Sequence, residues 1–162
     1  QAGPGRADPG APRVPGAAGS LRAVILLETN VLSALMLRKP DATVVAWLDA
    51  QPAESIWTTA ITVFEIQTGL ELLPAGRRRT GLEHAFEQLL TDELDGRVQS
   101  FDRAAALAAG TIAAARQRAG QTMEVRDVEI AGIAVARRAT LATRNTRHFA
   151  DLGVDLVDPW TD

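Results

Sequence analysis

Four residues of the sequence have the chemistry of a metal site: Glu28, Glu65, Asp127 and Asn145. Carboxylate oxygens are the ligands that hard divalent cations such as Mg²⁺ prefer, usually one or two of them together with water. Carboxylates held close together repel one another, and a cation removes that cost. A site of this kind can activate a water molecule and stabilise the charge of a phosphoryl transfer. If the fold gathers these residues, they predict a metal-dependent hydrolytic site.

Each of these residues also has a purely structural explanation. Glu28 follows an apolar segment and precedes a helical pattern, where an acid often caps the helix. Asp127 lies early in another predicted helix and can interact favourably with the dipole there. Glu65 interrupts an apolar helical segment, which favours a position drawn toward the interior but also fits a solvated helix face. Asn145 fits an ordinary loop position. Only their joint placement favours a functional site.

The elements that must position these residues alternate between strands and helices. We predict strands over residues 23–27, 55–59, 98–101, 140–143 and 155–157. We predict helices over residues 30–37, 42–50, 61–73, 76–94, 103–119 and 125–138. This alternation predicts an α/β fold with a mostly parallel sheet. Active sites in such sheets form at the carboxyl ends of the strands, and both Glu28 and Asn145 directly follow a predicted strand.

Composition narrows the class of protein. The chain of 162 residues has the size of one domain, and its Gly-, Pro- and Ala-rich opening predicts a disordered tail over residues 1–21 before a domain over residues 22–162. The absence of cysteine excludes disulfides and thiolate metal sites. No apolar run approaches the roughly 20 residues that cross a bilayer, so we expect a cytoplasmic protein without membrane contact. A net charge of -3 argues against a general nucleic-acid coat protein but permits a nuclease.

Four segments of the chain resemble the PIN-domain ribonuclease toxins, specifically the VapC/FitB-like branch of type II toxin–antitoxin systems. They read LLETNVLS over residues 26–33, TAITVFEI over residues 59–66, RDVEIAGIA over residues 126–134 and ATRNTRHF over residues 142–149. The closing VDLVDPW, residues 154–160, also resembles that branch. The segments follow the family's order and spacing over nearly the whole predicted domain.

The resemblance implies an α/β/α sandwich, a homodimer, a cognate antitoxin as partner, and an endoribonuclease that cleaves RNA with Mg²⁺ or Mn²⁺. It places Glu28, Glu65 and Asp127 at the three acidic positions, which hold the metal. Asn145 takes the fourth position, which is polar and often acidic across the family. We therefore interpret these four residues as catalytic.

The resemblance and the neighbouring residues also predict a set that contacts substrate. Two arginines flank Asn145 and can meet RNA phosphates near the metal, although a pair of surface salt bridges is the alternative. Thr29 and Asn30, which follow the first acid, match the family's motif. Thr143, which precedes the fourth position, matches it as well. The predicted substrate-binding residues are Thr29, Asn30, Thr143, Arg144 and Arg147.

One departure from the family concerns the first acidic position, where aspartate is usual and this chain has Glu28. The extra methylene moves the carboxylate by about an ångström, which octahedral Mg²⁺ tolerates poorly and which can cost about 10²-fold in rate. We expect metal binding with reduced activity. Two alternatives remain: a PIN-fold binding protein that Glu28 has disabled, and a structure-specific DNA nuclease, because the same acidic chemistry serves both polymers.

Overall fold

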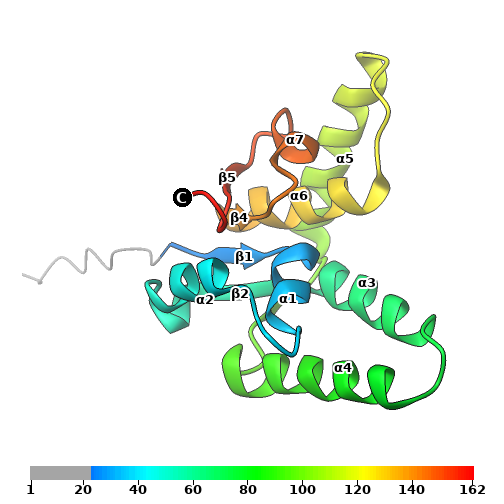
Figure 1. The fold of residues 1–162 in the computed structure, drawn as a ribbon. Helices are drawn as coiled ribbons and strands as arrows, with labels where there is room; N and C mark the ends of the chain where they lie inside the picture. The colour runs from blue at the N-terminus through cyan, green and yellow to red at the C-terminus, as the bar shows by residue number, and fades with distance from the viewer. Residues whose placement is uncertain (1–22) are drawn as a thin grey trace, which may run out of the picture.

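A five-stranded sheet of order β3-β2-β1-β4-β5 runs through the centre of the molecule, and all of its pairings are parallel (Figure 1). The strands are β1 (Ile25–Leu27), β2 (Ile56–Thr59), β3 (Val98–Gln99), β4 (Thr140–Ala142) and β5 (Asp155–Val157). The computed structural model describes residues 23–162, so the tail expected over residues 1–21 lies outside the described residues. The expected α/β fold with a mostly parallel sheet is confirmed, although most strands are one or two residues shorter than predicted.

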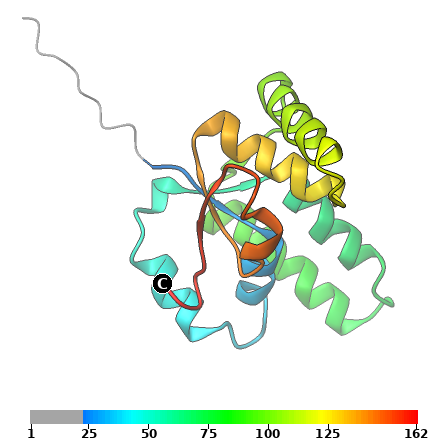
Figure 2. The ribbon, with the colours of Figure 1, turned by 90° about the horizontal axis from the view of Figure 1, so that it is seen from above.

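Helices cover both faces of the sheet, which confirms the expected α/β/α sandwich (Figure 2). One face carries α1 (Thr29–Leu35), α2 (Ala42–Asp49), α3 (Ala60–Glu71) and α4 (Arg77–Gln88). The other face carries α5 (Arg103–Arg118), α6 (Val125–Arg137) and α7 (Thr146–Phe149). Among residues 23–162, none of the helices combines the length and the apolar character that a membrane crossing requires.

The structure differs from the predicted elements in three places. The helix predicted over residues 76–94 ends as α4 at Gln88 and continues as the π-helical segment Leu89–Glu93. A 3₁₀ turn, Ala53–Ser55, precedes β2, and α7 follows β4. Neither short element was predicted, because three or four residues are too few to show a helical period.

The two layers of helices pack on opposite sides of β1. Successive strand residues point to opposite faces, so Leu27 packs with the apolar side chains of α1 to α4 while Leu26 packs with those of α5 and α6. Both leucines are almost fully buried. This double burial is what the continuous apolar run at residues 23–27 predicted.

The starts of α2 and α5 are fixed by side-chain caps. Asp41 Oδ1 accepts a hydrogen bond from the backbone N–H of Thr43 at 2.9 Å, and Asp102 Oδ1 accepts one from that of Ala105 at 3.0 Å. These bonds satisfy amide groups that the first helical turn leaves unpaired. Aspartate is a residue type that favours helix starts, and Gly120 after α5, where φ is +65°, is the type that commonly ends a helix.

Helices α5 and α6 approach each other closely because small residues line their contact. A Cβ atom added at Gly132 would lie 2.6 Å from the carbonyl oxygen of Ala105 and 2.6 Å from the Cβ atom of Ala109. A side chain of any other kind would push the two helices apart. Gly132 therefore fixes the position of α6, which carries Asp127 in its first turn.

Candidate metal and catalytic site

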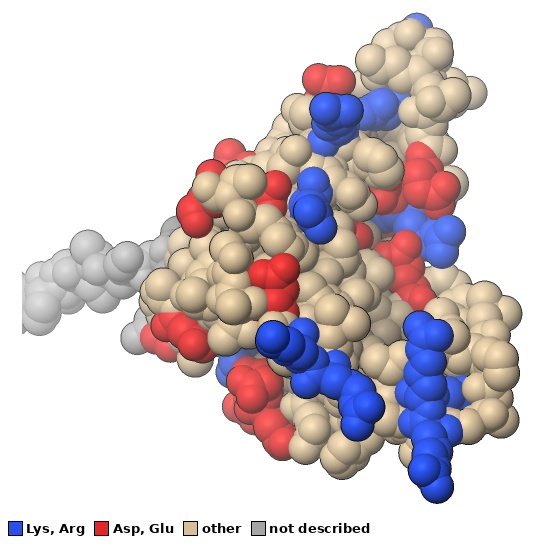
Figure 3. Space-filling model, in the orientation of Figure 1, with Lys and Arg blue, Asp and Glu red and all other residues tan. Residues whose placement is uncertain are grey.

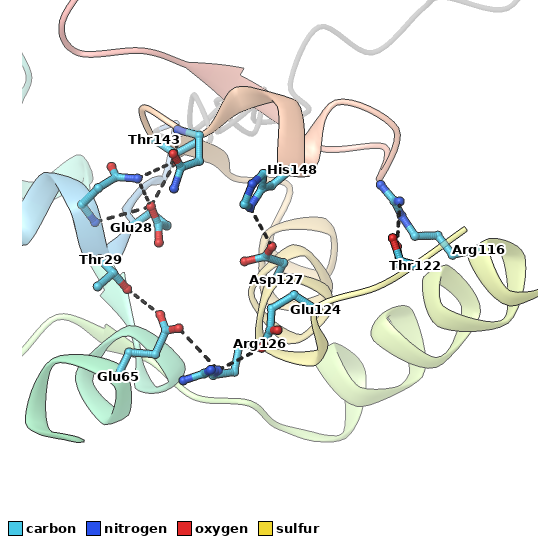
Figure 4. A network of polar contacts seen from close by, with 12 residues as sticks. Glu28, Thr29, Glu65, Arg116, Thr122, Glu124, Arg126, Asp127, Thr143 and His148 are labelled. Carbon is cyan, nitrogen blue, oxygen red and sulfur yellow. Dashed lines mark hydrogen bonds and ion pairs between the residues drawn. The ribbon is translucent and has the colours of Figure 1, made fainter. Parts of the chain in front are cut away.

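The predicted acidic residues come together at the carboxyl edge of the sheet. Glu28 directly follows β1, and α3, which carries Glu65, begins where β2 ends. Helix α6 runs back toward the start of β4, so its first turn, with Asp127, lies at the same edge. Figure 4 shows the carboxyl groups of these three residues bordering one common space.

Glu28 is the centre of a buried polar cluster. Its side chain is only 7% exposed, and its Oε2 atom accepts hydrogen bonds from the side-chain amide of Asn30 and from the hydroxyl of Thr143 at 3.1 Å. The backbone N–H of Asn30 lies 3.4 Å from the same oxygen, so Glu28 also caps α1. The structural and functional explanations of this residue are therefore compatible.

Thr143 and Asn30 link the first strand to the fourth. The Thr143 hydroxyl, besides donating to Glu28, accepts hydrogen bonds from the Asn30 amide at 3.1 Å and from the backbone N–H of Asn145 at 3.0 Å. The Asn30 Oδ1 atom accepts one from the backbone N–H of Arg144 at 3.1 Å. Every hydrogen-bonding group of Thr143's side chain is used, which leaves Glu28 little freedom to turn away.

Glu65 is held by two neighbours of different kinds. The Thr29 hydroxyl donates to its Oε2 atom at 2.5 Å, and the Arg126 guanidinium lies 3.6 Å from its Oε1 atom. Arg126 also pairs with Glu124 at 3.1 Å, and its side chain is 45% exposed. Arg126 was not among the predicted site residues, although it lies beside Asp127 in the motif RDVEIAGIA.

Asp127 pairs with a histidine from the short helix α7. The Nδ1 atom of His148 lies 3.1 Å from Asp127 Oδ2, and the two side chains are 60% and 20% exposed. His148 is too far along the sequence to be linked with Asp127 by spacing. The structure brings them together because α7 follows β4 and contacts α6.

Burial works against the ionised form of two of these acids. Burial raises the pKa of Glu28, the hydrogen bonds from Thr143 and Asn30 oppose that rise, and the charge of Glu65 adds to it. Burial also raises the pKa of Asp127, and His148 opposes this rise. A cation near these carboxyl groups would favour their ionised forms.

The donor set fits a hydrated divalent ion better than a closed cage. Within residues 23–162, no three acidic or histidine side chains lie close enough together to hold one metal ion directly. The carboxylates are nevertheless oxygen donors that border a common space, and Mg²⁺ commonly keeps several waters while using one or two carboxylates. Asp127 Oδ1 accepts no hydrogen bond from the described residues, so this oxygen is available for an ion or its water.

The other predicted site residues have different surroundings. Asn145 is exposed, and its side chain makes no hydrogen bond with the described residues. The Arg144 guanidinium lies over the Trp160 ring, 5.1 Å from its centroid, and Trp160 Nε1 donates to Asp41 at 3.1 Å. Arg147 is exposed and lines a cavity together with Asp127. Within the described part of the chain neither arginine forms a salt bridge.

Charges of both signs are intermingled around the site. Figure 3 shows acidic and basic side chains next to one another at the notch between the end that carries α5 and the end that carries α3 and α4. This face is not uniformly basic. Phosphates would therefore be met here by individual arginines rather than by a broad positive field.

Comparison with known proteins connects this geometry to a family. A model of the PIN domain matches residues 25–154. Over 137 residues the chain is 39% identical to the VapC ribonuclease Y4jK of Sinorhizobium fredii. This match covers 85% of this chain and 98% of that protein. The crystal structure of FitAcB from Neisseria gonorrhoeae superposes with a TM-score of 0.77 at 34% identity, covering 86% of this chain and 100% of that one. DNA-bound VapBC from Salmonella typhimurium gives a TM-score of 0.71 at 25% identity, covering 85% and 98%.

Proposed function

The chain belongs to the PIN domain family, and on this premise we propose that it is a metal-dependent endoribonuclease, the toxin of a toxin–antitoxin pair. One observation carries the proposal. The carboxyl groups of Glu28, Glu65 and Asp127 border a common space at the carboxyl edge of the sheet, in a chain that is 39% identical to a VapC ribonuclease. Three carboxylates gathered at one edge have little structural value, because burial and mutual repulsion disfavour their charges.

In this proposal Glu28, Glu65 and Asp127 hold hydrated Mg²⁺ or Mn²⁺, directly or through water. The ion supplies a water of lowered pKa and stabilises the charge that develops on the phosphate. Thr143 and Asn30 keep Glu28 oriented through the bonds described above, and Thr29 does the same for Glu65. Groups that fix a ligand in this way typically contribute 10- to 100-fold to affinity or activity.

The remaining polar residues meet the RNA. Asn145 is placed to orient water, because its side chain is exposed beside Thr143 and has no partner among the described residues. Arg147 is exposed and forms no ion pair among the described residues, so its guanidinium can reach a phosphate. Arg144 remains in the proposed set, but its stacking on Trp160 points it toward the C-terminal segment and away from the acids. Arg126 is added, because it can bridge Glu65 and an approaching phosphate.

The partner in this proposal is a cognate antitoxin, and the active form is a homodimer. Support for the antitoxin comes from the related solved structures FitAcB and VapBC, which are toxin–antitoxin complexes, whereas the homodimer is proposed from the family resemblance alone. The chain also exposes large apolar side chains on its helices, such as Phe64 on α3 and Leu107 on α5. Exposed apolar groups of this size are common at protein interfaces.

The proposal is tested by cleavage of a total tRNA and rRNA pool with Mg²⁺, with Mn²⁺ and with EDTA. We expect metal-dependent fragments from the parent and from Asp151→Asn, an exposed acid away from the site, but none from Glu65→Gln. Equal cleavage by the parent and Glu65→Gln would refute the assigned site. Cleavage of a flapped DNA with intact RNA would instead show a DNA nuclease, and absence of cleavage even after Glu28→Asp would show a binding protein.

A further inference from the structure

We infer that a second cavity beside the acidic site is an RNA subsite, in which Arg116 and Arg147 bind the phosphate of a nucleotide next to the cleaved bond. This inference rests on the proposed function and extends it to a residue, Arg116, that the sequence motifs do not include. The cavity has a volume of about 440 Å³ and lies between the end of α5, the turn over residues 119–124 and helix α7. A volume of this size is within the range of ligand sites, roughly 300–1,000 Å³.

The cavity lies directly beside the space between the acids. Asp127 lines this cavity and also borders the space between the acids, so the two sites share a wall (Figure 4). His148 lines the same wall and is mostly exposed. A strand of RNA with its cleaved phosphate at the carboxyl edge must continue on at least one side. The cavity offers it a path directly past Asp127.

The charged residues of the cavity favour a phosphate. Two arginines and two acids line the cavity, and both acids already have partners: Glu124 pairs with the Arg126 guanidinium at 3.1 Å, and Asp127 contacts His148 Nδ1 at 3.1 Å. Arg116 and Arg147 have no acidic partner among the described residues. Two arginines that line one cavity and form no ion pair within the described residues suit a phosphate, which the guanidinium fork binds through two parallel hydrogen bonds.

Arg116 is held in place at the cavity in a way that suits a ligand. Arg116 is partly buried, and its Nη1 atom donates to the backbone carbonyl of Thr122 at 3.4 Å (Figure 4). One bond to a neutral carbonyl orients the guanidinium but leaves most of its donors for another group. Met123, which is exposed in the same turn, gives the cavity an apolar wall against which a sugar or base can pack.

A structural explanation of Arg116 must be separated from this one. A cation in the last turn of a helix interacts favourably with the helix dipole, and Arg116 lies in the last turn of α5. Arg118 lies in the same turn, is exposed and does not line the cavity. It is therefore the matched control, because it has the same dipole contribution without the proposed contact.

The test compares Arg116→Ala, Arg116→Lys and Arg118→Ala on the shortest RNA fragment that the parent cuts from the tRNA and rRNA pool, shortened one nucleotide at a time from each end. We expect Arg116→Ala to raise KM about tenfold with kcat within about twofold, and to lower the salt dependence of binding by about one charge. Arg116→Lys should be intermediate, because it keeps the charge but loses the fork. Arg118→Ala should match the parent. The penalty at Arg116 should vanish once truncation from one end removes the nucleotide that reaches the cavity.

Two results would overturn the inference. One is equal KM values for Arg116→Ala and Arg118→Ala on every length of RNA. The other is a penalty that is the same for every length, since a merely structural role would give that. If Arg116→Ala unfolds at a lower temperature than the parent, the same comparison of KM against RNA length is made with Arg147→Ala, and its result decides for or against the subsite. In either case the proposed function stands if the parent cleaves RNA and Glu65→Gln does not. A parent that cleaves no RNA would refute the proposed function itself.

Discussion

The two halves of the acidic site are held in different ways. On one side is the Glu28 cluster, formed by Glu28, Asn30 and Thr143, whose bonds are buried or partly buried and made between residues next to β1 and β4. On the other side is the Glu65–Asp127 rim, in which Glu65 is paired with the exposed Arg126 and Asp127 contacts the exposed imidazole of His148. The cluster is therefore part of the folded framework. The rim depends on side chains that can be displaced by substrate or metal.

The largest effect should come from the rim, at Asp127. Asp127→Asn removes a charge that the proposed ion needs, and the loss of several kcal/mol of stabilisation corresponds to about 10³-fold in kcat/KM. Because burial raises the pKa of Asp127, its ionised form is unfavourable in the fold, so the variant should unfold at the same temperature as the parent or higher. RNA cleavage and thermal unfolding measure the two effects. A large loss of stability would show that the rim is structural.

The next effect tests whether the cluster holds Glu28 at the best distance for catalysis. Glu28→Asp shortens the side chain by a methylene, and we expect cleavage up to about 10²-fold faster in Mg²⁺, since misplacement by an ångström costs on that order. Single-turnover cleavage of the same RNA by parent and variant measures it. A variant no faster than the parent would contradict the hypothesis that Glu28 reduces activity.

The two halves of the acidic site should also differ, by a smaller amount, in how much they contribute to the free energy of unfolding. Thr143→Val removes the three hydrogen bonds of the Thr143 hydroxyl and leaves the backbone N–H of Asn145 without its partner, so we expect the free energy of unfolding to fall by about 1–3 kcal/mol. Arg126→Ala breaks a half-exposed ion pair and should cost no more than about 1 kcal/mol. Urea unfolding of both variants makes the comparison. Equal losses would show that the cluster is no more part of the framework than the rim.

The smallest effect is the pH dependence of stability. Because the pKa of Glu28 is raised in the folded state, the folded state binds more protons than the unfolded chain. The stability from this group is fully present below the ordinary pKa of 4.5 and is lost as pH rises through the raised value. In EDTA, Glu28→Gln should therefore flatten the decline of unfolding free energy across this window. A parallel decline in the variant would assign the effect to other groups.

Much of the fold follows from local patterns, and the parts that do not are explained by distance along the chain. The caps at Asp41 and Asp102 and the double burial of Leu26 and Leu27 were predictable, because each depends on a few adjacent residues. The π-helical end of α4 was not, since its sequence continues the same helical period.

The candidate site shows the same division. The carboxyl-edge rule and the motifs indicated Glu28, Glu65 and Asp127, but not how each is held. The link from Thr143 to Glu28 spans 115 residues, and the pairing of His148 with Asp127 spans 21. The stacking of Arg144 on Trp160 is likewise set by how the C-terminal segment returns across the sheet edge. No local period in the sequence encodes such contacts.

The link between β1 and β4 has a consequence during translation. The ribosome makes Glu28 early, but Thr143 follows 115 residues later, a delay of roughly 6–23 seconds at about 5–20 residues per second. Until then β1 has no β4 to pair with, and Glu28 lacks the hydroxyl that orients it. A nascent chain, or one cut short before residue 143, has the first acid of the site without the partner that fixes it. The cell that makes this protein therefore meets a complete cluster only after nearly the whole chain has been synthesised.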